Sequence, residues 1–157
     1  MSEDALIAGL VAMRSRAKTV SPPVSAAAIQ NAEAALGFTL PALLAKLYGQ
    51  VANGGFGPGY GIMGLDGGHT NDDGDSCVKL YRKFRMPYRG KVIWPDGYLP
   101  VCYGGCSLYS VLDCSSDAAP VLAIDLADGC SPSAFRKESA SLLEWLDAWF
   151  RGVSRPA

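Results

Sequence analysis

Residues 29–55 constrain the fold more than any other stretch of the sequence, because they combine two short helices with a sharp turn. Residues 29–36 have the apolar spacing of one helix, and Gly37 is placed to end it. Pro41 opens the next helix, where its fixed φ is suitable and its missing N–H would have been unpaired anyway. Residues 53–55, Asn-Gly-Gly, tolerate the positive φ of a sharp turn. The stretch predicts a helix pair followed by a turn, and it contains no catalytic motif.

The composition limits the class of protein. A chain of 157 residues with 49% apolar and 18% charged residues is expected to be a single globular domain, residues 1–157, and not disordered. The net charge of −1 gives no argument for nucleic acid or an acidic membrane as the partner. No apolar run approaches the roughly 20 residues of a membrane helix. The N-terminus has acids where a signal peptide has bases, so we expect a retained helix in a cytoplasmic protein.

The spacing of apolar residues predicts the remaining elements. Helices are expected over residues 4–18, 26–36, 41–51 and 76–84, and strands over residues 60–65, 99–103, 107–113 and 121–126. Gly104-Gly105 is a candidate tight turn between two of these strands. A last helix begins after Ser141, because Ser141 and Glu144 have the spacing of a capping box and an amphipathic stripe follows them.

Alternation along the last two predicted strands separates two faces of a sheet. One face, expected to pack against helices, contains Leu108, Leu112, Leu122, Ile124 and Leu126. The other, expected to be partly open, contains Ser107, Tyr109, Val111, Asp113, Val121, Ala123 and Asp125. Because residues 92–135 contain no Lys or Arg, we expect this region to carry a negative field.

The order of these signals resembles the SUKH superfamily, which contains yeast cell-wall-assembly regulators, Syd-type proteins and many bacterial toxin-immunity proteins. The matching residues are Glu33, Leu36-Gly37, Leu40-Pro41, Leu47-Tyr48, Asn53-Gly54-Gly55, Trp94, Leu99-Pro100, Gly104-Gly105, Leu112-Asp113 and Leu142-Leu143-Glu144-Trp145-Leu146. The likeness covers about residues 25–151, and residues 1–24 look like an added N-terminal helix. The resemblance implies an α+β fold, with a small antiparallel sheet of about four strands flanked by helices. It also implies a binding role and supplies no catalytic residue.

Metal and thiol chemistry are not favoured by the residue pattern. Cys102, Cys106 and Cys114 do not have the spacing of a zinc module, and a cysteine within a strand is expected to be a packed, reduced thiol. His69 is the only histidine and is expected to be solvated, because it lies in a loop rich in Gly and Asp. We therefore predict no metal, no cofactor and no catalytic residue. A small enzyme that uses Cys102 or Cys106 remains a lesser alternative.

Two charged segments have ordinary interpretations. Residues 71–75 do not fit a calcium loop, because position 12 of the pattern would be Arg82 where Glu is needed. The run from Lys79 to Lys91 contains six cations and interleaved aromatic residues. On a net-acidic domain, such a run favours an amphipathic element with a cationic outer face over a nucleic-acid surface.

Aspartates give the sharpest functional hypothesis. A negative surface can mimic nucleic acid and cover the basic active site of a nuclease, whereas the alternative is that the acids only keep the domain soluble. The predicted partner-binding residues are Tyr109, Asp113 and Asp125, followed by Asp117 and the loop residues Asp66, Asp72, Asp73 and Asp75. The first hypothesis is a non-enzymatic immunity protein that neutralises a nuclease or deaminase type of toxin domain by direct contact. The second is a regulatory scaffold module that binds ordinary cellular proteins.

Overall fold

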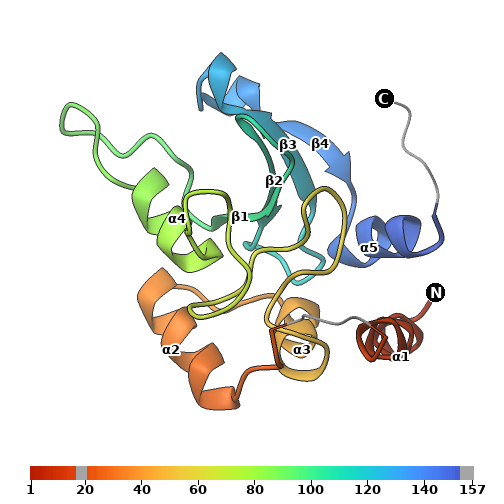
Figure 1. The fold of residues 1–157 in the computed structure, drawn as a ribbon. Helices are drawn as coiled ribbons and strands as arrows, with labels where there is room; N and C mark the ends of the chain where they lie inside the picture. The colour runs from red at the N-terminus through yellow and green to blue at the C-terminus, as the bar shows by residue number, and fades with distance from the viewer. Residues whose placement is uncertain (17–20, 153–157) are drawn as a thin grey trace.

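The computed structural model describes residues 1–16 and 21–152 and confirms the α+β fold (Figure 1). The helices are α1 (Glu3–Arg14), α2 (Ala26–Leu36), α3 (Ala42–Gln50), α4 (Cys77–Phe84) and α5 (Leu142–Phe150). The strands are β1 (Tyr98–Tyr103), β2 (Leu108–Asp113), β3 (Val121–Asp125) and β4 (Arg136–Ser139). They form one antiparallel sheet in the order β1-β2-β3-β4. Two short 3-10 turns, η1 (Leu126–Asp128) and η2 (Pro132–Ala134), connect β3 to β4.

Local signals in the sequence account for the helix ends. Ser2, Ser25, Ser76 and Ser141 each accept a hydrogen bond from a backbone N–H in the first turn of a helix, which satisfies one of its unpaired donors. Gly37 ends α2 with a φ of 84°, as predicted. The predicted first helix extends to residue 18, and residues 17 and 18 lie outside the described residues. Within the described residues, α1 ends at Arg14.

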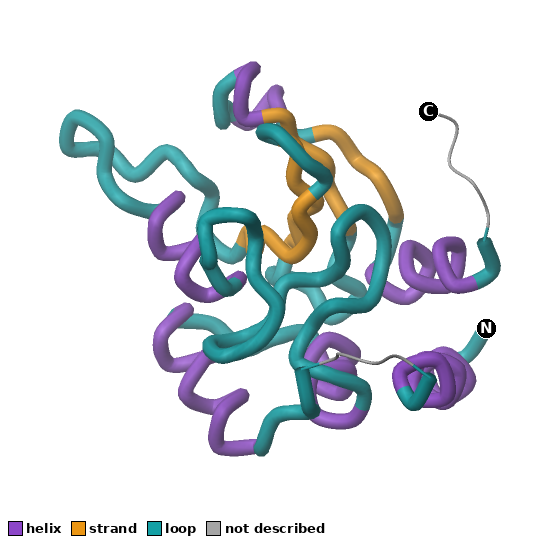
Figure 2. Tube along the Cα trace, viewed as in Figure 1, coloured by secondary structure: helices purple, strands orange, loops and turns teal. Residues whose placement is uncertain are grey.

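The helices surround the sheet and share one core with it. Helix α1 contacts α3 and α5, helix α2 contacts α3 and α4, and α4 packs on β1 while α5 packs beside β4 (Figure 2). The buried core draws on every helix and on β1, β2 and β3. The N-terminal extension is therefore part of the packed domain, because Leu6 and Leu10 of α1 are fully buried.

The loop after α3 is organised by Asn53, which is buried. Its Oδ1 accepts from the N–H of Leu65 at 2.7 Å, and its backbone oxygen accepts from the N–H of His69 at 3.0 Å. The predicted strand over residues 60–65 is not formed. Only Ile62 makes an isolated bridge, to Cys102 of β1. Tyr60 and Met63 also donate to backbone oxygens of β1, but Gly59 and Gly61 have φ values of 60° and 94°, which are not those of a regular strand.

Strand β4 was not predicted from the sequence. Its four residues, Arg-Lys-Glu-Ser, show no apolar alternation. Strand β4 is short and lies at the edge of the sheet, where charged side chains are common. Arg136 pairs with Ala123, and Lys137 pairs with Leu122. The negative field expected for residues 92–135 is therefore offset in the sheet, since two cations of β4 lie beside β3.

The predicted assignment of sheet faces is also wrong. Tyr109 pairs directly with Ile124, and Leu108 pairs directly with Asp125, so the members of each pair share a face. Tyr109 therefore lies on the same face of the sheet as Ile124, and Asp125 lies on the other face. Leu108, expected in the core, is 44% exposed, whereas Tyr109, expected on an open face, is 9% exposed. The error arose because alternation gives the two faces of each strand but not the register between strands.

Candidate protein-interaction surface

The acidic loop at residues 66–75 is held rigidly by Asn71, which is buried. The Oδ1 atom of Asn71 accepts from the N–H groups of Asp73 and Asp75, at 3.1 and 2.9 Å. Its Nδ2 atom donates to the hydroxyl of Tyr109 at 3.2 Å. One asparagine therefore fixes the shape of the loop and attaches it to β2. These hydrogen bonds order the loop within the chain itself.

Tyr109 supports the loop through its hydroxyl, which bonds to Asn71, and through the packing of its ring. Its ring contacts Phe84 and Tyr103, with centroids 5.7 and 5.4 Å away. Burial raises the pKa of Tyr109, and the nearby carboxylates of Asp73, Asp75 and Asp72 raise it further, so the hydroxyl stays protonated. Tyr109 was predicted to contact a partner on an open face. Its burial instead places it under the loop, as the residue that positions Asn71.

Asp75 was predicted as a partner-binding residue, but its carboxylate lies inside the protein against α4. Its side chain is 2% exposed and pairs with Lys83 at 2.7 Å and with Lys79 at 3.2 Å. Burial alone would raise the pKa of Asp75, but the hydrogen bonds from Lys83 and Lys79 outweigh burial and lower it below its ordinary value. The carboxylate therefore joins the loop to both the first and the last turn of α4.

This ion pair predicts a pH dependence of stability. A lowered pKa means that the stabilisation by Asp75 is fully present above the ordinary carboxyl pKa, about 4, and is lost as the pH falls through the lowered value. We expect Asp75→Asn to lower the free energy of unfolding at neutral pH by about 1–2 kcal/mol, because both lysines are half exposed and screened. Urea unfolding at several pH values measures this, with exposed Asp73→Asn as the control. Equal acid sensitivity of Asp75→Asn and the wild type would contradict the assignment.

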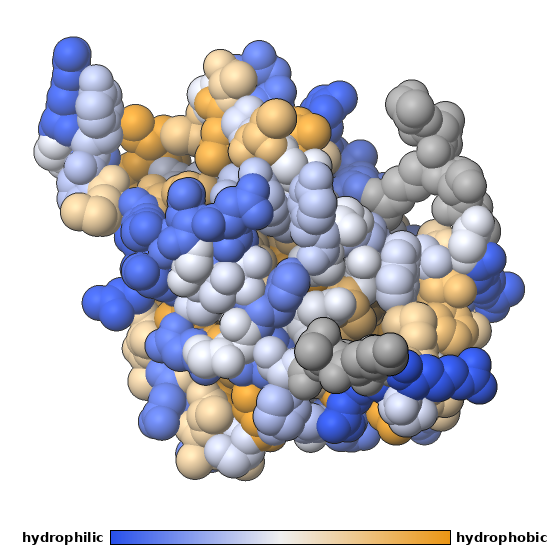
Figure 3. Space-filling model, in the orientation of Figure 1, coloured by the Kyte–Doolittle hydropathy of each residue, from blue (hydrophilic) through white to orange (hydrophobic). Residues whose placement is uncertain are grey.

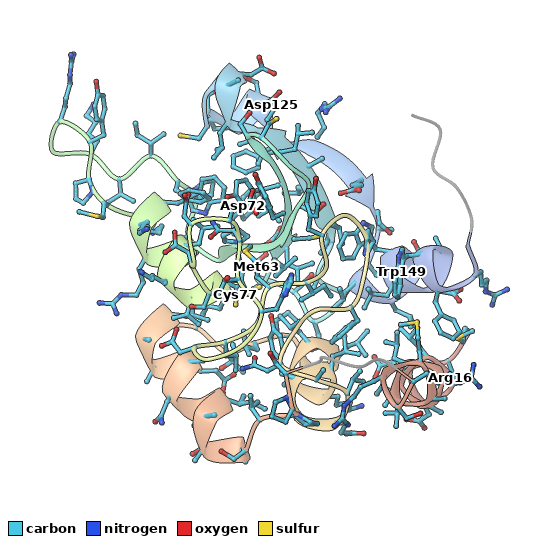
Figure 4. The ribbon with its side chains drawn as sticks, in the orientation of Figure 1. Arg16, Met63, Asp72, Cys77, Asp125 and Trp149 are labelled. Atoms are coloured by element: carbon cyan, nitrogen blue, oxygen red, sulfur yellow. The ribbon has the colours of Figure 1, made fainter. Side chains whose placement is uncertain are left out.

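Asp72 and Asp73 are exposed carboxylates of the loop, and Asp72 lies beside a pair of stacked tyrosines. The hydroxyl of Tyr103 donates to Oδ2 of Asp72 at 3.1 Å. The ring of Tyr60 stacks on that of Tyr103, with centroids 5.6 Å apart, and Tyr60 is 65% exposed. Figure 4 shows Asp72 in front of the strands. We call Tyr60, Asp72, Asp73 and Tyr103 the acidic–aromatic patch.

His69 and the surrounding glycines fix the position of Tyr60. The Nε2 atom of His69 lies 2.7 Å from the backbone oxygen of Tyr60, and the N–H of Tyr60 donates to the oxygen of Tyr103 at 3.1 Å. His69, expected to be solvated, is therefore half-buried and holds the loop that carries Tyr60. The exposed ring of Tyr60 is thus presented on a backbone that is bonded on both sides. Sequence reasoning missed Tyr60 and Tyr103. A tyrosine between two glycines is the one signal that could have pointed to Tyr60.

The other predicted aspartates accept hydrogen bonds at turns and helix starts. Asp117 accepts from the N–H of Ala42 at 2.9 Å and so caps α3, because Pro41 at the N-cap position has no side-chain hydrogen bond to offer. Asp113 accepts from the N–H and hydroxyl of Ser115, and Asp66 accepts from the hydroxyl of Ser76. Hydrogen bonds from Ser107 and from the N–H of Ala127 lower the pKa of Asp125. The structure therefore does not gather these residues into the patch.

The described residues offer little to metal or thiol chemistry. Residues 1–16 and 21–152 contain no group of three or more His, Cys, Asp or Glu residues placed to hold a metal ion. Burial raises the pKa of Cys77 and of Cys114 to about 12, so both stay protonated at neutral pH. Cys102 is buried and donates to the backbone oxygen of Pro58 at 2.9 Å. Cys106 is exposed at a turn. In the same described part of the chain, no helix has the length and apolar character needed to span a membrane.

Comparison with known proteins agrees with the fold and with the predicted resemblance. A family model described as the SMI1 / KNR4 family (SUKH-1) matches residues 23–148. The match includes α2, α3, α4, all four strands and the acidic–aromatic patch. It begins after α1. No curated protein matches the chain.

Proposed function

Because the chain belongs to the SMI1 / KNR4 family (SUKH-1), we propose that it is a non-enzymatic binding protein that neutralises a toxin domain by direct contact. The proposal rests chiefly on the acidic–aromatic patch. The patch combines two exposed carboxylates with an exposed tyrosine, on a loop whose backbone is already ordered.

The chemistry of the patch suits a cationic partner. Tyrosine is enriched among the residues that dominate binding energy, because it buries a large rigid area at a small entropic cost. Asp72 supplies negative charge beside the stacked Tyr60 and Tyr103, and the next residue, Asp73, adds a second exposed carboxylate. Asp75 does not add to that charge because it is neutralised by Lys79 and Lys83. Such a surface complements the basic, substrate-binding cleft of a nuclease and speeds its association. The proposed partner is therefore a toxin domain with a basic cleft that contains an apolar pocket.

Reversing the charge of the patch tests this proposal. We expect Asp72→Lys combined with Asp73→Lys to weaken binding of the toxin domain about 100-fold, since two favourable contacts become repulsive. The first candidate partner is a toxin-like C-terminal domain encoded beside the gene of this chain. Binding is measured by calorimetry, and protection is measured as growth of cells that express both proteins.

A matched control separates the patch from the overall charge. Asp4→Lys combined with Asp128→Lys makes the same change in net charge at exposed sites on α1 and η1, and it should bind and protect as the wild type does. If the patch variant also binds normally, the patch is not the interface. Binding without protection would instead support the alternative function, a regulatory module for protein interactions.

A further inference from the structure

An arm formed by residues 86–93 projects away from the body of the molecule, beyond the end of α4 (Figure 1). Tyr88 and Lys91 exchange two backbone hydrogen bonds, of 2.7 and 3.1 Å. Between them, Arg89 and Gly90 have φ values of 50° and 78°, which is the pattern of a two-residue hairpin turn. At the base of the arm, the Nη1 atom of Arg85 donates to the backbone oxygen of Trp94 at 2.6 Å. The arm is therefore a short hairpin closed at both ends.

The arm exposes more apolar surface than an isolated domain would normally keep in water. Met86 and Tyr88 are 68% and 61% exposed, and Val92 and Ile93 are both close to half exposed. The arm also carries Arg89 and Lys91 and contains no acid. In Figure 3 its end is hydrophilic and more hydrophobic colours lie nearer its base. Clustered apolar side chains with a charged rim are typical of an interaction surface.

The acidic–aromatic patch has the complementary chemistry. The loop with Asp72 and Asp73 precedes α4 and folds back along it, since Asp75 pairs with Lys83 in the last turn of the helix. The arm follows that turn and projects away from the body of the molecule (Figure 1). The rings of Tyr60 and Tyr103 form an apolar surface that suits Met86 and Tyr88 of an arm. The two aspartates carry the negative charge that suits Arg89 and Lys91. In Figure 4 the arm points away from Asp72 of its own chain.

We propose that two copies of the chain form a two-fold dimer in which the arm of each copy lies on the acidic–aromatic patch of the other. A chain that carries both a cationic apolar arm and an acidic aromatic patch is complementary to a second copy of itself after a two-fold rotation. Both arms and both patches are then used, so association stops at the dimer. A membrane is disfavoured as the partner, because the tip of the arm is charged and its apolar residues lie nearer the base.

The dimer would regulate the site proposed above, because it covers the same patch. A toxin domain and a second copy of the chain would then compete for the patch, and the toxin domain would bind the monomer. The self-association does not depend on that function being correct, since it follows from the complementarity of the arm and the patch alone. The experiment below therefore uses no toxin, and its failure leaves the proposed function standing.

Charge exchange between arm and patch tests the dimer. We compare sedimentation velocity of the full chain with that of an arm variant, Arg89→Asp with Lys91→Asp, and a patch variant, Asp72→Lys with Asp73→Lys. Aspartate suits position 89, because it tolerates the positive φ there. Each variant alone places like charges at both contacts, so its dimer should dissociate about 100-fold more readily than that of the wild type.

An equimolar mixture of the two variants gives the decisive result. In a mixed dimer, the introduced aspartates of the arm variant meet the introduced lysines of the patch variant. At the second contact, the original patch of the arm variant meets the original arm of the patch variant. The mixture should therefore regain the dimer, which also shows that both variants are folded. The Asp4→Lys and Asp128→Lys control should remain dimeric. A wild-type chain that is monomeric at about 100 μM, a mixture that stays monomeric, or binding of the monomer to anionic vesicles through its arm would overturn the proposal.

Discussion

Replacing Gly64 by alanine should lower the free energy of unfolding by about 3 kcal/mol, because the site has no room for a methyl group. A Cβ atom at this position would lie 2.2 Å from the backbone oxygen of Asn53 and 2.6 Å from its Oδ1 atom. Neither oxygen can move away without loss, since the first accepts from the N–H of His69 and the second from that of Leu65. The substitution therefore disrupts the network that shapes the loop carrying Tyr60.

Urea or thermal unfolding measures this effect, and Gly74→Ala is the matched control. Gly74 has a φ of 81°, but nothing lies within 4 Å of a Cβ atom placed there. Its replacement should cost only the backbone strain of a positive φ, about 1–2 kcal/mol. If Gly64→Ala were no more destabilising than Gly74→Ala, the close contact with Asn53 would not be a constraint on the fold.

Replacing Trp94 by alanine should also be severely destabilising, by about 3–5 kcal/mol. Trp94 is 2% exposed, and its ring contacts Phe84 and Phe135, with centroids 4.6 and 5.2 Å away. Its Nε1 atom donates to the backbone oxygen of Tyr98 at 2.6 Å. The loss combines a large cavity with an unpaired carbonyl at the start of β1.

The control for Trp94 is Trp149→Ala. Trp149 is only half-buried, at the surface of α5, so less apolar area is lost and the surroundings can fill with water (Figure 4). We expect it to cost less than half as much as Trp94→Ala in the same unfolding experiment. Equal costs would mean that the aromatic cluster around Trp94 does not contribute the expected packing energy.

Most of the helices could be predicted from the sequence, because the signals are local. Ser25 and Ser141 cap the helices that were expected to follow them, and Gly37 ends α2. Such signals depend on residues within one turn of the chain. Strand β4 could not be predicted in this way, since Arg136–Ser139 gains its strand conformation only by pairing with β3.

The arrangement of the sheet and of the site could not be predicted, because it depends on which segments lie side by side. Alternation along one strand does not give this. Tyr109 was placed with Asp125 because both fall at alternate positions, but the register between β2 and β3 puts them on opposite faces. Asp117 illustrates the same limit, since its role is to cap α3, 75 residues away. The loop at residues 66–75 was singled out because of its aspartates. Its division into buried Asp75 and exposed Asp72 and Asp73 depends on α4, which supplies the two lysines.

The central claim is that the acidic–aromatic patch contacts the partner, and hydrogen exchange in the complex tests it most directly. The exchange of each peptide is compared between the free chain and its complex with the toxin-like domain. Slower exchange in peptides that cover residues 57–61 and 70–75, with β4 unchanged, is the predicted result. Protection confined to β4 or α1, with the patch exchanging as in the free chain, would contradict the account.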